Sequence, residues 1–181
     1  MAQAHKMPYI GEVVKGTTPK MDLSSLVDDS LLTEDIIDPR WENSRFFKLK
    51  LMKAKQAGKR YEEIVAHILE KMGHKIEKPQ SSDHDRIVDG RKIEIKGSML
   101  TKGTDDWYSF LQIRPDQDYD AMIFMTIDFD HIRLYELDKE EIMDRIMSGV
   151  FKKQHGGNKA NSGTWCYNGP IEKLNLRPIC N

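Results

Sequence analysis

Cysteine is scarce in this chain: among 181 residues, only Cys166 and Cys180 carry a thiol. They lack the spacing of metal-ligand cysteines, so the sequence is typical of the reducing cytoplasm, although a disulfide between the two is left open. No apolar run approaches the ~20 residues of a membrane span, and residues 1–6 lack the apolar core of a signal peptide. We therefore expect a cytoplasmic protein that does not associate with membranes.

Net charge is nearly absent as well, at −1, but the charges are strongly segregated along the chain. Residues 1–39 carry a net charge of −4, residues 40–60 of +7, residues 61–144 of −9 and residues 145–181 of +5. Carboxylates in the centre are suited to hold a metal ion, and the basic segments on either side are suited to hold phosphates. The pattern is typical of proteins that act on nucleic acid, but it is not unique to them.

The hydrophobic pattern predicts both helices and strands. We expect helices over residues 40–58 and 60–72, ended by Gly58 and Gly73, and a third over 138–150 with Asp138 as its N-cap. Strands are expected over 75–78, 107–113, 121–127 and 132–137, besides a hairpin around residue 90. The prediction is an α/β (α+β) fold with a central mixed β-sheet flanked by helices. Residues 1–39 would form an N-terminal arm, residues 40–150 the core, and residues 151–181 a basic loop and tail of the same domain.

Asp89-Gly90 is the strongest local signal in the sequence, because a two-residue type I′ turn needs positive φ at both central positions. Counting outward from the turn places Asp85 opposite Glu94, and Lys96 shares their face of the sheet. Opposed carboxylates repel each other, so a fold that keeps them side by side is expected to place something positive between them. The alternative is a solvated hairpin with ordinary surface charges.

Asp85 and Glu94 would supply the carboxylate oxygens that Mg²⁺ prefers, and the backbone carbonyl of Ile95 could add a third oxygen. Such an ion polarises a phosphoryl oxygen and acidifies a bound water. Lys96 would orient that water or stabilise the negative charge that develops at phosphorus. We favour this electrostatic role over that of a general base, because two adjacent carboxylates stabilise the charged ammonium.

Asp85 followed by Glu94-Ile95-Lys96 resembles the Asp…(Asp/Glu)-X-Lys signature of the PD-(D/E)XK, or restriction-endonuclease-like, nuclease superfamily, with His84 where the signature has proline. The resemblance covers about residues 60–137. It implies a restriction-endonuclease-like nuclease core that hydrolyses phosphodiester bonds of double-stranded DNA with Mg²⁺, or with Mn²⁺ in its place. The small size and the lack of helicase or methyltransferase segments resemble a Type II restriction endonuclease subunit, which implies sequence-specific cleavage by a homodimer.

Many members of this superfamily add a glutamate from the helix that precedes the signature strands. The resemblance makes Glu63 the first candidate for this catalytic role and Glu62 the second. For either residue, a solvated helix carboxylate is the competing interpretation.

Further residues are candidates for DNA contacts by their type and position. Lys53 and Lys55 lie in the basic segment and suit phosphates, whereas Ser98 and Gln112 lie at the end of the signature strand and on the next strand. The glycine-rich stretch of residues 155–164 supplies four more candidates: His155, Asn158, Lys159 and Asn161. Polar strand residues that face solvent and a flexible surface loop are the competing interpretations.

Two alternatives to a restriction enzyme fit the same residues. One is a structure-selective or repair nuclease, such as a junction resolvase, or an RNase. The other is a non-catalytic nucleic-acid-binding module with the same fold.

Overall fold

The computed structural model describes residues 38–101, 103–154 and 163–179. In chain order these residues form η3 (Pro39–Trp41), α1 (Phe47–Lys50), α2 (Ala54–Lys71), β1 (Ile76–Glu77), β2 (Arg86–Val88), β3 (Arg91–Met99), β4 (Tyr108–Ile113), β5 (Ala121–Ile127), β6 (Ile132–Asp138), α3 (Lys139–Met147), β7 (Lys152–Lys153), β8 (Trp165–Gly169), η4 (Ile171–Leu174) and β9 (Arg177–Pro178). Among the described helices, none is long and apolar enough to cross a membrane.

The strands form a six-stranded sheet in the order β1-β2-β3-β5-β6-β9 and a three-stranded sheet in the order β4-β8-β7. β3 and β5 run parallel, whereas the other neighbours in the six-stranded sheet are antiparallel. Every residue of β5 is buried, as expected for a strand whose two faces are both covered. The predicted α/β (α+β) class with a central mixed sheet is therefore confirmed.

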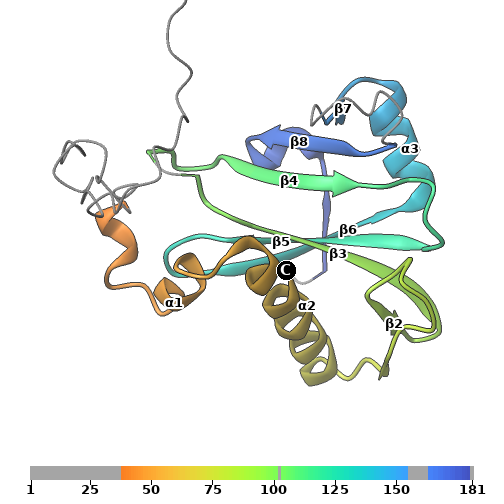
Figure 1. Cartoon of the computed structure of the whole chain (residues 1–181), viewed down its shortest axis with the longest axis horizontal. Helices are drawn as coiled ribbons and strands as arrows, with labels where there is room; N and C mark the ends of the chain where they lie inside the picture. Colours follow the sequence, from red (N-terminus) through yellow and green to blue (C-terminus); the bar gives the residue numbers. More distant parts are fainter. Residues whose placement is uncertain (1–37, 102, 155–162, 180–181) are drawn as a thin grey trace, which may run out of the picture. The chain divides into compact units, whose positions relative to one another are not determined.

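Different layers cover the two faces of the six-stranded sheet (Figure 1). On one face, α2 packs so closely on β3 that the side chain of Tyr61 lies over the backbone of Gly97. On the other face lie α3 and the three-stranded sheet, where Phe110 of β4 contacts Phe124 of β5 edge to face with ring centroids 5.0 Å apart. The six-stranded sheet is thus the middle layer.

Alternation along β3 assigns its side chains to these two layers. Because Gly97 lies against α2, Ile93 and Ile95 face that helix, and both belong to the buried core. Glu94 and Lys96 therefore point to the opposite side, toward β4.

The hairpin of β2 and β3 has the predicted register, with Arg86 paired to Ile93. Asp89 and Gly90 have φ angles of 50° and 85°, as a type I′ turn requires. A two-residue turn leaves no slack between the strands, so the pairing of Arg86–Val88 with Arg91–Ile93 follows from local sequence alone.

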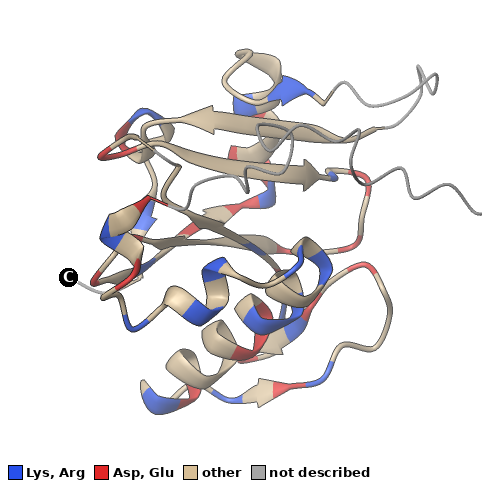
Figure 2. Cartoon of the chain, turned by 60° about the vertical axis from the view of Figure 1, so that its left-hand side comes forward, with Lys and Arg blue, Asp and Glu red and all other residues tan. Residues whose placement is uncertain are grey.

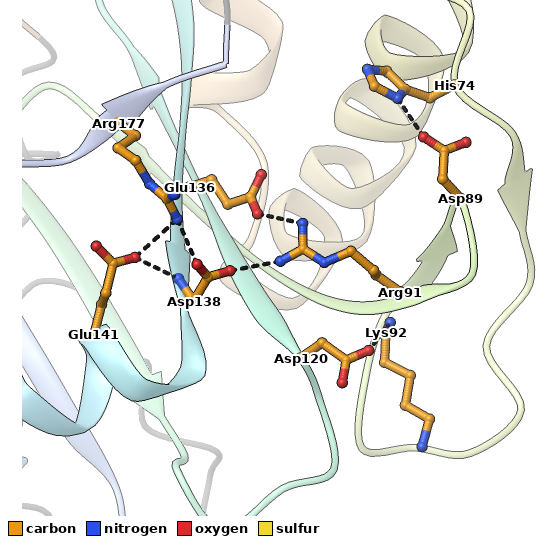
Figure 3. Close-up of polar contacts among 9 residues, drawn as sticks. All are labelled: His74, Asp89, Arg91, Lys92, Asp120, Glu136, Asp138, Glu141 and Arg177. Carbon is orange, nitrogen blue, oxygen red and sulfur yellow. Dashed lines mark hydrogen bonds and ion pairs between the residues drawn. The ribbon is translucent and has the colours of Figure 1, made fainter.

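Ion pairs join the start of β3 to the end of β6 and to the C-terminal segment (Figure 3). Arg91 bonds to Glu136 (2.7 Å) and Asp138 (2.6 Å), while Arg177 bonds to Asp138 (2.8 Å) and Glu141 (3.0 Å). Asp138 is the predicted N-cap of α3, and its N–H donates to Glu141 Oε2 (2.9 Å). These contacts stabilise the end of the sheet where β3 begins, away from the Ile95–Met99 end of the strand.

Some expected boundaries are wrong. Gly58 does not end a helix but lies inside α2, and the segment before it forms only η3 and α1, with the break at residues 51–53. A glycine inside a helix costs only about 1 kcal/mol, which the packing of α2 on the sheet outweighs. β3 extends to Met99, and the expected C-terminal tail contributes β7, β8 and β9.

Candidate active site

A cleft opens where β2 ends beside β3. β2 pairs with β3 only along Arg91–Ile93, whereas β5 follows β3 from Ile93 to Met99. Beyond Ile93, β3 therefore has a partner strand on one side and an open edge on the other. This edge lines a cleft of about 760 Å³.

Asp85 is fixed at this open edge by the backbone of β3. Its Oδ2 accepts a hydrogen bond from the N–H of Ile95 (2.8 Å), and its own N–H donates to the carbonyl of Ile93 (2.9 Å). The N–H and the C=O of one strand residue point to the same edge, so the carbonyl of Ile95 also faces the cleft beside Asp85. Because β2 begins only at Arg86, the Asp85 carboxylate takes the place that the backbone acceptor of a longer strand would occupy.

Glu94 and Lys96 form a buried ion pair in the same cleft. Lys96 Nζ lies 2.7 Å from Glu94 Oε1, and the side chains are 15% and 7% exposed. Burial raises the pKa of Glu94 to about 6; the ammonium of Lys96 opposes this rise, and the neighbouring Asp85 carboxylate adds to it. A second cation beside Glu94 would stabilise its ionised form and lower its pKa again.

Glu62, rather than Glu63, is the helix carboxylate that lines the cleft. Arg86 lies between it and the strand: its Nη1 is 3.4 Å from Glu62 Oε2 and donates to the carbonyl of Asp85. Burial raises the pKa of Glu62, and the Asp85 carboxylate raises it further. Glu63 forms an ion pair with Arg60 (2.6 Å) outside the cleft. The order of preference between Glu63 and Glu62 is therefore corrected.

The way α2 packs on the sheet explains which glutamate faces the cleft. Val65 and Leu69 are buried against the sheet, Ile64 and Ile68 are partly buried beside them, and Met72 is 41% exposed. Glu62 and Glu63 point in directions about 100° apart around the helix axis, and this packing turns Glu62 toward the cleft and Glu63 away from it.

Two walls enclose the open edge of β3. The wall on α2 consists of Ala54, Lys55, Ala57, Gly58, Tyr61 and Glu62, and the opposite wall includes Ser109, Leu111, Gln112, Arg114 and Gln117. Lysines and arginines follow α1 and α2 beside it (Figure 2), within the segment of net charge +7. Lys55 and Arg114, one on each wall, form no ion pair within the described part of the chain. An anion could therefore engage both of them.

The donor set at the edge of β3 suits a hard divalent cation. Asp85 and Glu94 offer carboxylate oxygens, and Ile95 offers a backbone carbonyl oxygen at the same edge. Among the residues that the structure describes, no three His, Cys, Asp or Glu side chains gather closely enough to hold a metal ion by themselves. Hard divalent cations take oxygen ligands of this kind, together with water molecules and substrate phosphate.

The structure separates the candidate DNA contacts. Lys55 and Gln112 line the cleft, but Lys53 lies outside it, at the N-cap of α2. Ser98 is only 5% exposed, and its Oγ accepts the N–H of Ser109 (2.9 Å). Its assignment as a DNA contact is therefore corrected: β4 covers it. The remaining candidates, His155, Asn158, Lys159 and Asn161, lie outside the described residues.

Several cleft residues escaped the sequence analysis. Arg114 and Leu111 carry no motif, and only the position of β4 brings them to the cleft. His84, next to Asp85 in the chain, does not line the cleft: it is 3% exposed, and neither ring nitrogen has a hydrogen-bond partner among the described residues. No pattern in the sequence distinguishes it from an exposed loop histidine.

Comparisons with known proteins add little to this geometry. No protein-family model matches the chain, and no curated protein matches it. Among solved structures, a bacterial homing endonuclease, I-Ssp6803I, is similar at 16% sequence identity and a TM-score of 0.42, over 51% of this chain and 74% of that one. At this TM-score the likeness carries no functional assignment.

Proposed function

We propose that this protein is a Mg²⁺-dependent DNA endonuclease that hydrolyses phosphodiester bonds at the open edge of β3. The observation that carries the proposal is the meeting of Asp85, Glu94 and Lys96 in one cleft, with the Ile95 carbonyl at the same edge. A solvated hairpin does not explain these contacts. Burying the Glu94–Lys96 ion pair costs desolvation free energy, and a catalytic role gives a reason for the fold to keep it.

Asp85, Glu94 and the carbonyl of Ile95 would hold the ion. When bound, Mg²⁺, or Mn²⁺ in its place, supplies polarisation of a phosphoryl oxygen and a more acidic bound water. In the hydrolysis itself, the water oxygen forms a bond to phosphorus, one bridging P–O bond breaks, and the leaving oxygen takes up a proton.

Lys96 has an electrostatic role in this proposal. Its ammonium lies 2.7 Å from Glu94 Oε1 and can turn toward a phosphate that enters the cleft. There it would stabilise the negative charge that develops at phosphorus, in a site with little water to screen it. Glu62 lies beside Asp85 and would position the attacking water or share a second ion, whereas Lys55 and Arg114 would hold flanking phosphates.

The finer assignment is a sequence-specific enzyme of the Type II restriction kind. Cutting both strands of double-stranded DNA needs two such clefts, so the proposal includes a homodimer. Sedimentation of the purified protein would measure its mass directly.

Cleavage of a supercoiled plasmid tests the site. We expect nicked and linear products with Mg²⁺ and none with EDTA, and a loss of at least about 100-fold in rate for Asp85→Asn and for Lys96→Met, the scale seen when one electrostatic stabiliser is removed. Asp83→Asn is the matched control, because Asp83 lies two residues from Asp85 but does not line the cleft. Undiminished cutting by both site variants would refute the assignment.

The products separate the alternatives. Discrete bands from a sequenced plasmid indicate sequence-specific cleavage, and a smear indicates a repair or degradative enzyme. Preferential cutting of branched DNA or RNA would identify a structure-selective nuclease or an RNase. Salt-dependent binding without any Mg²⁺-dependent product would identify a non-catalytic module.

A further inference from the structure

β4 contains an irregularity where it lines the cleft. Its pairing with β8 shifts register between Phe110 and Ile113. Both of these residues are fully buried, whereas the two between them, Leu111 and Gln112, are exposed in succession. A regular strand alternates its faces, so this is a β-bulge that turns two neighbouring side chains away from the core.

The backbone at this bulge is unusual for its residue type. Gln112 has a φ of 56°, in the left-handed region that glutamine rarely adopts. Its N–H donates to Gln154 Oε1 (2.8 Å), which holds the bulge in this conformation. Costly backbone conformations of this kind concentrate at functional sites, and this one directs Leu111 and Gln112 to the cleft that holds Asp85.

The two side chains at the bulge are not engaged in the fold. The carboxamide of Gln112 makes no hydrogen bond to any residue that the structure describes, and Leu111 is 48% exposed. The pair therefore offers the amide donors and carbonyl acceptor of Gln112 and the exposed apolar surface of Leu111 to a ligand in the cleft.

Resting on the proposed function, we propose that this bulge reads the DNA sequence, with Gln112 contacting an adenine and Leu111 the methyl group of a thymine. In the major groove, adenine offers an N7 acceptor and an N6 donor, which a glutamine carboxamide can meet with two hydrogen bonds, and thymine adds an apolar methyl group. The carboxylates and the bulge line one cleft, so the base pair that is read lies close to the cut.

The test uses a substitution that keeps the bulge. Gln112→Gly removes the carboxamide while favouring positive φ, so the variant is expected to fold at least as well as the wild type, which thermal unfolding checks. Gln112→Glu keeps the length but only accepts hydrogen bonds, which suits the N4 donor of cytosine rather than adenine. Gln56→Ala is the matched control, because Gln56 lies on α2 outside the cleft.

Two readouts are taken with the full-length chain: enrichment of bound duplexes from a random library in Ca²⁺, and end-mapping of products from the same library in Mg²⁺. We expect the wild type to select an A·T pair near the cut, Gln112→Gly to lose this preference by about 5- to 150-fold, Gln112→Glu to shift it toward cytosine, and Gln56→Ala to retain it. The binding arm keeps the test separate from catalysis.

Unchanged selection by folded Gln112→Gly, or no A·T selection by the wild type, would overturn this inference even if Mg²⁺-dependent cleavage stands. Selective binding that depends on Gln112 without any cleavage would support the bulge but sink the proposed enzymatic function.

Discussion

Replacing Gly97 with alanine is expected to push α2 away from β3 and to destabilise the protein. A Cβ at this position would lie 2.4 Å from Cδ2, 2.6 Å from Cγ and 3.0 Å from Cβ of Tyr61. Carbon atoms normally approach to about 3.5–4.0 Å, so the overlap is on the order of 1 Å. Of these atoms, Cβ moves only with the helix backbone, and Cγ and Cδ2 move away only if Tyr61 leaves its rotamer, so either α2 shifts or Tyr61 gives up its packing on β3.

The magnitude follows from two opposing effects. Overpacking of a close contact costs typically about 1–3 kcal/mol, whereas replacing glycine inside a strand recovers about 0.5–1 kcal/mol of chain entropy. We therefore expect Gly97→Ala to lower the free energy of unfolding by about 1–2 kcal/mol. The shift of α2 would also move Glu62 relative to Asp85, so cleavage should fall as well.

Urea unfolding at equilibrium measures the loss, provided that the slope with denaturant is unchanged. Gly58→Ala is the matched control: a Cβ there meets nothing within 4 Å, so the same change inside α2 should stabilise by about 0.5–1 kcal/mol. Introducing Tyr61→Ala into the Gly97→Ala variant should lower the free energy of unfolding by less than introducing it into the wild type, because in the variant it also removes the clash. If Gly97→Ala is as stable as the wild type, the close approach of α2 to β3 is wrong.

Three further outcomes are expected. Burial raises the pKa of Glu94 from 4.5 to about 6, so the stability that protonated Glu94 contributes to the folded state is fully present below pH 4.5 and is lost as the pH rises through 6. Between pH 4 and 7, the metal-free wild type should therefore lose about 2 kcal/mol of unfolding free energy relative to Glu94→Gln. Thermal unfolding across this range measures the difference, and the same pH dependence in both proteins would contradict the prediction. Arg91→Ala should cost only about 0.5–1 kcal/mol in urea unfolding and less in 1 M salt, since both of its ion pairs are exposed; a loss that is independent of salt would argue against this reading. Lys55→Ala and Arg114→Ala should each reduce the slope of the logarithm of the observed DNA-binding constant against the logarithm of salt concentration by about 0.9, whereas Lys53→Ala should change it little. An equal effect of all three substitutions would refute the conclusion that Lys55 and Arg114 contact DNA in the cleft and Lys53 does not.

The hairpin shows how much local sequence can determine. A two-residue turn at Asp89-Gly90 fixes the register by covalent geometry and φ preference alone, and the observed pairing follows it. Asp85 and Glu94 were therefore identifiable before any tertiary contact was known. The buried run of β5 and the N-cap of α3 were equally readable, because each depends on the burial pattern or capping chemistry of a short contiguous segment.

The sequence could not predict the placement of residues whose position depends on packing between distant segments. Glu62 and Glu63 are adjacent on α2 and differ only in the direction in which they point around the helix axis. How the helix packs on the sheet at Gly97 decides which of the two faces the cleft. Ser98 looked available because nothing near it in sequence shows that β4 covers it. The bulge at Gln112 likewise arises from pairing with β8, more than 50 residues further along the chain.

The sequence by itself thus determined the register of the hairpin and the shared face of Glu94 and Lys96, because a tight turn and strand alternation need no information from elsewhere. Only the tertiary structure decided that β2 begins at Arg86, so that the edge of β3 stays open and the Asp85 carboxylate accepts the N–H of Ile95. It also decided which walls face that edge, since the rotation of α2 and the irregularity of β4 are set by packing and pairing across the whole fold. Neighbouring residues in the sequence supply the chemical groups of the cleft, whereas packing between distant segments sets its shape.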